Sequence, residues 1–204
     1  MATLVQRLGL STLGDRTKWT FSAWIKKSRS VSSGSEFIFS SNNERTGGGN
    51  YSSLFFQDDN LGYYNYWSSS TQHQLVTNRK FRDVNAWYHI VMAWDSTLAT
   101  ADDRFKFYVN GVQETSFSAR TNPPQNEGSF MNVAGNDNFI GTQTNNLSGA
   151  FLGSMSHVHF TDGTAYDASS FGSTDATTGE WKIKTDVSVT YGTNGFFILK
   201  DGNS

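Results

Sequence analysis

The chain has 204 residues, a net charge of −2 and no cysteine, so it is long enough for one domain with a sizeable core but cannot form disulfides. Aromatic residues make up 15% of it, and its 16 basic and 18 acidic residues are interspersed without a basic patch. This balance argues against binding to nucleic acid or to a membrane surface. The missing cysteines also exclude a zinc site with thiolate ligands, and no apolar run approaches the roughly 20 residues of a membrane span.

The N-terminal segment MATLVQRLGLSTLGDR has no long apolar stretch, because Arg7 interrupts it early. We therefore expect no signal peptide, and synthesis in a cytoplasm. Residues 1–16 are interpreted as an N-terminal arm that precedes the first long strand.

Alternation of apolar and polar residues predicts short strands along the chain. One face of KWTFSAWIKK carries four apolar residues: Trp19, Phe21, Ala23 and Ile25. Trp24 falls on the opposite face of the same predicted strand. EFIFSS and YSSLFFQ follow, and the turn formers at 58–60 predict a hairpin between YSSLFFQ and the next strand.

The stretch NLGYYNYW carries aromatic residues on both of its faces. Tyr63 and Trp67 point one way, whereas Tyr64 and Tyr66 point the other. One set is expected to pack between two sheets, which leaves the other set without an obvious role in the core.

Later strands are predicted at WYHIVMAWD, RFKFYVNGVQET, DNFIGT and GSMSHVHFTDG. One face of RFKFYV carries three apolar residues: Phe105, Phe107 and Val109. Asn110-Gly111 predicts a two-residue hairpin turn, because both residues tolerate positive φ. Met155 is out of phase with the inward-facing Val158 and Phe160, which predicts a β-bulge between them.

These short strands, with polar turns and at most a single helical turn in DASSFG, predict an all-β fold in which two antiparallel sheets form a jelly-roll sandwich. Residues 1–172 form the expected domain. Residues 173–204 are rich in Thr and Gly, and we expect a C-terminal extension that packs on the sandwich or on a neighbouring subunit.

The segments WTFSAWIKKS, WYHIVMAWDST, DRFKFYVNGVQE, FIGT and GSMSHVHFTDGTAYDASSFG follow the strand order of the laminin-G-like, concanavalin A-like lectin/glucanase superfamily, which residues 18–172 resemble. The resemblance implies a jelly roll with one sheet that often binds glycans. Some members of the superfamily hold calcium near the binding rim, and some are glycosidases. The stretch TGEWKIK…YGTNGFFILKDGNS resembles the segment after such domains in structural proteins of tailed bacteriophages, especially marine ones.

Catalytic carboxylates are not evident in the sequence. Retaining glycosidases place two carboxyl groups about 5–5.5 Å apart. The chain has five glutamates, and none form the close pattern of the glucanase branch: Glu36, Glu44, Glu114, Glu127 and Glu180. We therefore expect no catalytic residues and no enzyme activity, with a polysaccharide depolymerase as the less favoured alternative.

No cofactor is required by this interpretation, but several acidic residues are candidates for a calcium site on converging loops. The candidates are Asp95, Asp102, Asp103 and Asp137, with Asn138 beside them. Their favoured alternative role is to form turns through local hydrogen bonds. His157 and His159 stand two apart as zinc ligands sometimes do, but structural histidines are the favoured interpretation.

The candidate ligand-binding residues are the surplus rings: Tyr64, Tyr66, Trp24 and Trp67. Tyr and Trp stack on sugars and are enriched in protein interfaces. The alternative is that loops or the C-terminal extension cover these rings.

The favoured function is that of a non-enzymatic structural protein at the surface of a phage virion, where it decorates the capsid or forms part of a tail fibre. Its expected partners are other virion subunits, and we expect it to form homo-oligomers. A glycan-binding adhesion module for host or environmental polysaccharide is the alternative.

Overall fold

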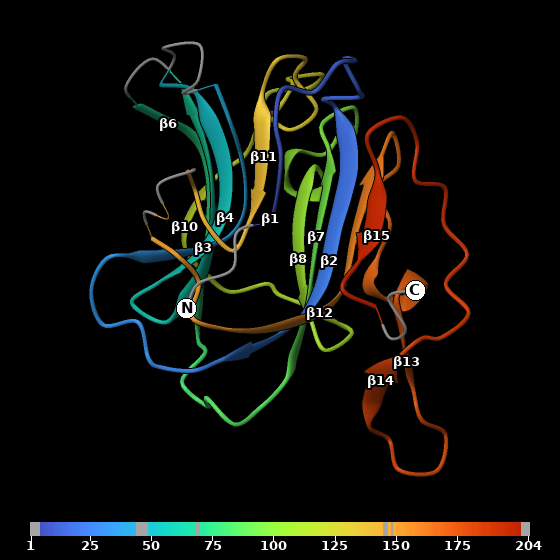
Figure 1. The fold of residues 1–204 in the computed structure, drawn as a ribbon. Helices are drawn as coiled ribbons and strands as arrows, with labels where there is room; N and C mark the ends of the chain where they lie inside the picture. The colour runs from blue at the N-terminus through green and yellow to red at the C-terminus, as the bar shows by residue number, and fades with distance from the viewer. Residues whose placement is uncertain (1–4, 44–48, 68–69, 145–146, 148, 201–204) are drawn as a thin grey trace.

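The computed structural model describes residues 5–43, 49–67, 70–144, 147 and 149–200, which form two large antiparallel sheets facing each other (Figure 1). The seven-stranded sheet has the order β1 (Val5–Arg7), β11 (Asp137–Ile140), β3 (Ser35–Asn42), β4 (Tyr51–Gln57), β5 (Asn60–Trp67), β6 (Ser70–Lys80) and β10 (Phe117–Thr121). The six-stranded sheet has the order β15 (Phe196–Ile198), β12 (Gly153–Asp162), β2 (Lys18–Lys27), β7 (Tyr88–Asp95), β8 (Phe105–Val109) and β9 (Val112–Gln113). The predicted all-β sandwich of two antiparallel sheets is confirmed.

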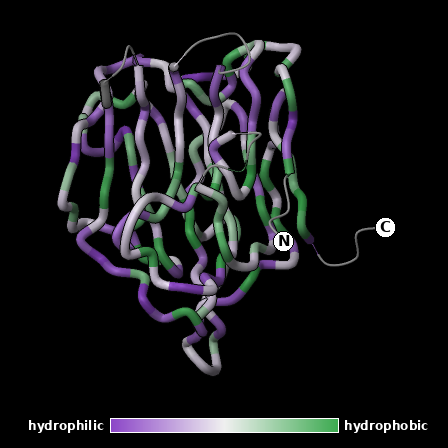
Figure 2. Tube along the Cα trace, turned by 60° about the vertical axis from the view of Figure 1, so that its left-hand side comes forward, coloured by the Kyte–Doolittle hydropathy of each residue, from purple (hydrophilic) through white to green (hydrophobic). Residues whose placement is uncertain are grey.

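The core lies between the two sheets and is built by the predicted period-two alternation, which Figure 2 shows as successive hydrophobic and hydrophilic residues along the strands. The four apolar residues predicted to share a face of β2 are all fully buried: Trp19, Phe21, Ala23 and Ile25. From the opposite sheet, the Tyr63 ring lies 5.9 Å from Trp19 between ring centroids. Tyr63 is therefore the core-facing aromatic residue of β5, and its neighbours Tyr64 and Tyr66 are left for the outer face.

Two local predictions about the backbone are confirmed. Asn110 and Gly111 have φ values of 48° and 82°, as the two-residue turn between β8 and β9 requires. On β12, the register against β2 shifts between Ser156 and His159, and His157 has a φ of 49°. This bulge places Ser156 and His159 on the same outer face of the sheet, opposite Trp24 and Ser22 of β2.

After β12 the chain passes over the outer face of the six-stranded sheet. It forms the 3₁₀ turn η3 (Ala168–Ser170), then the two-stranded sheet β13 (Gly172–Thr174) and β14 (Trp181–Ile183), and then returns as the edge strand β15 beside β12 (Figure 1). A second apolar cluster joins this segment to the sheet, and it contains Val91, Ala168 and Phe171 with Tyr108, Tyr166, Trp181, Val187 and Val189 packed against them. Residues 163–198, which we call the C-terminal cover, thus pack on the sandwich itself.

A further helical segment in the described part of the chain is η2 (Ala101–Asp103), a short turn between β7 and β8. Among the described residues, no helix is long and apolar enough to cross a bilayer.

Candidate functional site

The β4–β5 hairpin presents tyrosine rings on the outer face of the seven-stranded sheet. Tyr51 and Tyr66 are direct cross-strand partners, and their rings stack with centroids 4.7 Å apart and planes 13° from parallel. Tyr64 lies two residues before Tyr66 and therefore points to the same side. All three side chains are partly exposed. We call Tyr51, Tyr64 and Tyr66 the tyrosine face.

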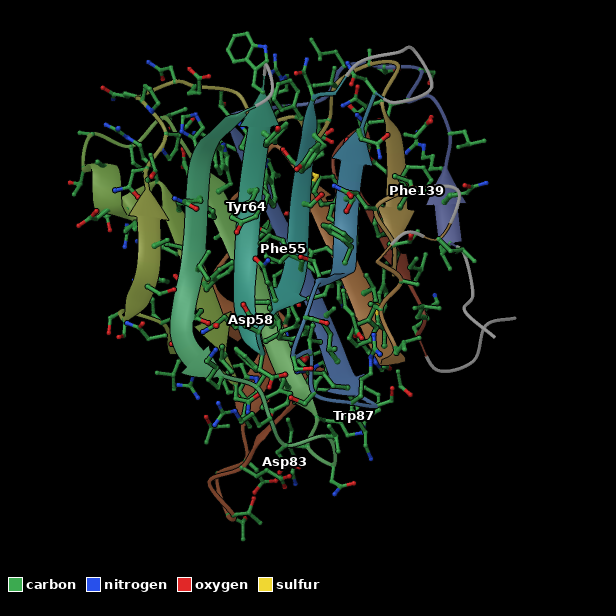
Figure 3. The ribbon with its side chains drawn as sticks, turned by 90° about the vertical axis from the view of Figure 1, so that its left-hand side faces the viewer. Phe55, Asp58, Tyr64, Asp83, Trp87 and Phe139 are labelled. Carbon is green, nitrogen blue, oxygen red and sulfur yellow. The ribbon has the colours of Figure 1, made fainter. Side chains whose placement is uncertain are left out.

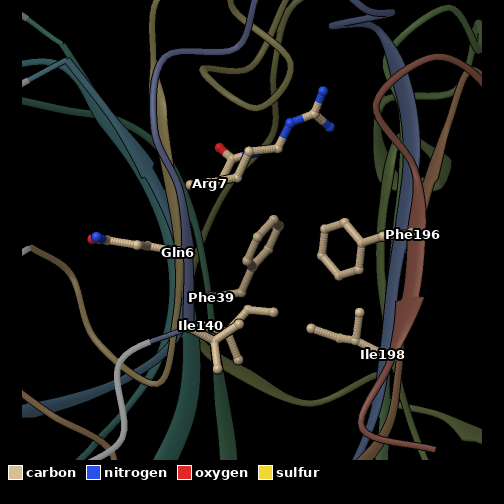
Figure 4. Close-up of a pocket in the computed structure, with 8 residues that line it drawn as sticks. Gln6, Arg7, Phe39, Ile140, Phe196 and Ile198 are labelled. Atoms are coloured by element: carbon tan, nitrogen blue, oxygen red, sulfur yellow. The ribbon is translucent and has the colours of Figure 1, made fainter. Parts of the chain in front are cut away.

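A buried aromatic residue supports this face from within the same sheet. Phe55 is fully buried although it points outward, and its ring covers Gly62 on the neighbouring strand. A Cβ at position 62 would lie 2.6 Å from the Phe55 ring, so only glycine fits there. The Tyr64 ring packs on Phe55 with centroids 4.5 Å apart, and Figure 3 shows the two residues side by side on this face.

The turn of the hairpin is fixed by an ion pair beneath it. Asp58 and Asp59 have φ values of 50° and 61°, which confirms the predicted turn. The buried Lys27 ammonium donates to Asp59 Oδ1 at 2.6 Å, and the Val31 amide donates to the same oxygen at 2.7 Å. Although burial opposes ionisation, the hydrogen bonds from Lys27, Ser30 and Val31 lower the pKa of Asp59 to about 2. The hairpin is thereby held to the rest of the sandwich.

The tyrosine face is uncharged. The outward-pointing residues of β4 and β5 are tyrosine, serine, phenylalanine, glutamine, asparagine and glycine. The Tyr64 hydroxyl donates to Gln57 Oε1 at 3.3 Å. Burial raises the pKa of both Tyr51 and Tyr64, so these phenols stay neutral. Flat rings beside amide and hydroxyl groups form a surface suited to a neutral ligand with apolar faces and hydroxyls.

The structure divides the four predicted ligand-binding rings among three places. Tyr64 and Tyr66 lie together on the tyrosine face. Trp67 ends β5 and is 49% exposed, with its ring 6.3 Å from Phe130 in an edge-to-face arrangement. Trp24 lies on the opposite sheet and is only 8% exposed. The four residues therefore do not form one site.

Trp24 illustrates the alternative in which other parts of the chain cover a surplus ring. It stacks on His89 with centroids 5.0 Å apart, and His89 stacks in turn on Trp181 of the C-terminal cover at 5.9 Å.

The sequence prediction missed one residue of the tyrosine face, namely Tyr51. Its position could have been inferred, because the alternation of YSSLFFQ and the hairpin turn after it place Tyr51 opposite Tyr66.

The structure brings only part of the predicted calcium site together: Asp95 and Asp103 line one pocket with Lys106, whereas Asp137 lies on β11 of the other sheet. Each predicted ligand takes part in local contacts. Asp95 accepts from the Thr97 amide and hydroxyl, at 3.0 and 2.6 Å. Asp103 pairs with Lys106 at 2.9 Å, Asp102 lies 3.3 Å from Arg120, and Asp137 accepts from the Gly9 amide at 2.6 Å. Within the described ranges, no three His, Cys, Asp or Glu residues are grouped to hold a metal ion.

The described glutamates lie on separate segments of the chain, each beside a basic side chain. The contacts are Glu36 with Arg29 at 2.6 Å, Glu114 with Arg79 at 2.5 Å, Glu127 with His73 at 3.9 Å, and Glu180 with Lys182 at 3.9 Å. Glu44 lies outside the described residues. This arrangement resembles structural ion pairing rather than the paired carboxyl groups of a glycosidase.

Comparison with known proteins bears on the whole fold. The family model described as the concanavalin A-like lectin/glucanases superfamily matches residues 6–169. The chain is similar to domain 4 of AbnA, an extracellular arabinanase from Geobacillus stearothermophilus solved with arabinotriose, with a TM-score of 0.55, 15% identity, and coverage of 80% of this chain and 68% of that one. It is also similar to the heptameric SAP-like pentraxin of Limulus polyphemus, with a TM-score of 0.52, 18% identity, and coverage of 80% and 70%.

Part of a viral protein shares the fold as well. Tailspike protein 2 of the Escherichia coli O157:H7 bacteriophage CAB120 gives a TM-score of 0.52 at 12% identity, with 78% of this chain matching 21% of that one. At such identities these likenesses show the fold alone. A search of curated protein sequences found no match.

Proposed function

Because the chain belongs to the concanavalin A-like lectin/glucanases superfamily, we propose that it is a glycan-binding module whose tyrosine face contacts a neutral saccharide. The observation that carries this proposal is the arrangement of Tyr51, Tyr64 and Tyr66 as partly exposed rings on an uncharged sheet face. Aromatic rings stack on the apolar faces of sugar rings, and the Gln57 amide beside them offers hydrogen bonds to hydroxyls.

The spacing of the rings favours an extended oligosaccharide over a single sugar. Tyr64 and Tyr66 are about 7 Å apart along β5, so they would contact successive parts of a chain. The arabinotriose in the AbnA domain is a neutral oligosaccharide of this kind, and it supports the choice of ligand class.

The test is calorimetric titration of the full chain with neutral oligosaccharides, namely arabinotriose, laminarihexaose and an agar hexasaccharide. Tyr66→Ala should weaken binding about tenfold, because it removes a stacking ring. Tyr66→Phe is the matched control, since it keeps the ring and should bind within about threefold of the parent. A folded Tyr64→Ala/Tyr66→Ala double variant with parental affinity would show that the ligand binds elsewhere. If the parent chain bound none of these sugars and no glycan on an array, the proposal would be overturned.

The proposed module is non-catalytic, and the separation of its described glutamates among cationic partners supports this. Incubation with laminarin and agar, followed by measurement of new reducing ends, provides the check. We expect no increase over the protein-free reaction, and sustained turnover would instead identify a depolymerase.

We further propose that the module works at the surface of a tailed-phage virion, after synthesis in the host cytoplasm, as a capsid decoration or part of a tail fibre. The sequence resemblance of the segment TGEWKIK…YGTNGFFILKDGNS to phage structural proteins supports this role, and so does the shared fold in a phage tailspike. Contacts with other virion subunits, including copies of this chain, would hold it there.

This role predicts two measurable properties. Peptides of the chain should be found by mass spectrometry in purified phage particles of the source, and light scattering should detect an oligomer at high concentration. A chain that is absent from particles and monomeric at all concentrations would contradict the virion role, but it would leave the glycan-binding proposal intact.

A further inference from the structure

A groove of about 460 Å³ lies between the outer face of the six-stranded sheet and the β13–β14 hairpin of the C-terminal cover. This volume falls within the range of about 300–1,000 Å³ that is typical of small-molecule sites. Three indole rings and three polar side chains line it: Trp24, Trp87, Trp181, Ser156, Glu180 and Lys182. The groove and the tyrosine face are on opposite sides of the sandwich. We call it the tryptophan groove.

Two of the three rings are fixed before any ligand arrives. The Trp181 indole N–H donates to His89 Nδ1 at 2.9 Å, so the neutral imidazole carries its proton on Nε2, which donates to Ser22 Oγ at 2.9 Å. His89 is sandwiched between Trp24 and Trp181. A ring held in place loses little conformational freedom on binding, which favours affinity.

Close packing against glycine fixes Trp181 further. A Cβ at Gly111 would lie 2.6 Å from the Trp181 ring, and a Cβ at Gly172 would lie 2.5 Å from it. The ring is therefore wedged between the β8–β9 turn and the start of β13. Trp87, in contrast, is 42% exposed at the groove, so it remains available to a ligand.

Trp24 provides the second observation that points to a ligand. Its side chain is more than nine-tenths buried, and its indole N–H has no hydrogen-bond partner. An indole nitrogen is a donor only, so the missing partner must be an acceptor such as a hydroxyl or ring oxygen. Buried donors are almost always paired in native proteins. The residue belongs to the groove lining. The nitrogen itself is shielded from solvent, so an oxygen of a bound molecule reaches it only when the side chains around it shift on binding.

The charges in the groove favour an uncharged ligand. Lys182 pairs with Asp175 at 2.9 Å and lies 3.9 Å from Glu180, so the ammonium of the lining is already balanced by carboxylates. The Ser156 hydroxyl and the Glu180 carboxylate add acceptors at the edge of the aromatic surface. A molecule that matches these features has flat apolar faces, several hydroxyls and no net charge.

We propose that the tryptophan groove is a second saccharide-binding site, which takes a neutral oligosaccharide between Trp87 and the fixed pair Trp24 and Trp181. The proposal extends the glycan-binding function but does not depend on the tyrosine face. The groove exists only where the C-terminal cover lies on the sheet. The cover would therefore supply part of this binding site, in addition to packing on the sandwich.

The two sites can be distinguished spectroscopically, because the tyrosine face contains no tryptophan. The full chain is titrated with cellohexaose, xylohexaose and laminarihexaose, and tryptophan fluorescence is recorded beside calorimetric binding. Binding in the groove should change the fluorescence. Trp87→Ala should weaken this response about tenfold, and Trp24→Phe, which keeps a ring but removes the N–H, about fivefold. Trp67→Ala is the matched control, because it removes an exposed indole outside the groove.

The expected result is a fluorescence response that depends on Trp87 and Trp24 and persists in Tyr66→Ala. A response that is unchanged in both groove variants overturns the second site. Calorimetric binding that Tyr66→Ala abolishes, with no tryptophan-dependent response, also overturns it while the tyrosine face stands. Absence of binding by every probe counts against both sites.

Discussion

The two outer faces of the sandwich carry surplus aromatic residues, but they differ in what lies over them. On the six-stranded sheet, the C-terminal cover packs over Val91, His89 and His159, and these side chains are buried. On the seven-stranded sheet, Tyr64 and Tyr66 remain partly exposed. A surplus ring in a strand is therefore not by itself a ligand-binding residue, because a distant segment of the same chain can bury it.

The covered face depends on neutral histidines, whereas the tyrosine face is built from tyrosine rings and contains no histidine. Burial, followed by the nearby His159, lowers the pKa of His89 to about 3. Burial, followed by His157, lowers the pKa of His159 to about 4. His159 Nδ1 lies 2.9 Å from the Tyr191 hydroxyl and its ring stacks on Phe197, so both histidines contact the cover.

The largest expected effect is therefore a loss of stability in acid. Both pKa values are lower in the folded chain than the value of about 6.5 in the unfolded chain, so unfolding takes up protons as the pH falls below that value. The stabilisation is complete above about pH 6.5 and is lost progressively towards pH 3–4. From pH 7 to pH 5, the free energy of unfolding should fall by roughly 2 kcal/mol for each histidine. Urea denaturation at a series of pH values measures this.

The matched variant is His89→Gln, whose amide offers one acceptor for Trp181 and one donor for Ser22 without titrating. It should remove about half of the slope between pH 7 and pH 5. If the free energy of unfolding of His89→Gln depended on pH as strongly as that of the parent chain, His89 would not contribute to the loss of stability in acid. The covered face would then not owe its acid sensitivity to His89.

The second effect tests how firmly the cover is attached. Trp181→Ala removes the ring that stacks on His89 and donates to it, and it leaves His89 Nδ1 without that donor. We expect a loss of roughly 3 kcal/mol in the free energy of unfolding, near the lower limit for buried large-to-small changes because the ring is partly exposed. Trp67→Ala, at a half-exposed tryptophan, should cost less than about 1 kcal/mol. Equal urea midpoints for the two variants would contradict the assigned role of Trp181.

The sequence predicts what lies within a strand better than what lies above it. Period-two alternation identifies the buried face of β2, and Asn110-Gly111 identifies a turn, because both depend on residues that are adjacent in the chain. The contact between Trp181 and His89 joins residues 92 positions apart, and no local pattern contains it. For this reason the alternation shows that Trp24 faces away from the core, but it does not show that the cover buries Trp24.

The same limit applies to the candidate site. Tyr64 and Tyr66 are predictable from their alternation with Tyr63, and Tyr51 is predictable once the hairpin register is known. The tryptophan groove is not predictable, because Trp24, Trp87 and Trp181 come from three separate segments that only the folded chain brings together. Turn-forming aspartates are similarly ambiguous, since the sequence does not show whether their oxygens converge.

A third, smaller effect concerns the turn beneath Trp181. Gly111 has a φ of 82°, and an added Cβ would collide with the Trp181 ring at 2.6 Å. Gly111→Ala should cost roughly 2 kcal/mol through backbone strain and displacement of the ring. Gly163→Ala is the matched control, because its φ is 91° and nothing lies within 4 Å of the added Cβ, so only the backbone cost of about 1 kcal/mol remains. Thermal unfolding of both variants isolates the contribution of the contact with Trp181.

The smallest expected effect on stability lies on the tyrosine face. Tyr66→Ala removes one cross-strand ring contact with Tyr51 but leaves the core intact, so it should cost at most about 1 kcal/mol. Tyr108→Ala is the corresponding change on the other sheet, where the ring packs against the cluster beneath the cover, and it should cost about twice as much. Urea midpoints of the two variants measure the difference. If Tyr66→Ala proved the more destabilising change, its ring would serve mainly to hold the sheet together, and the case for stacking on a sugar would weaken.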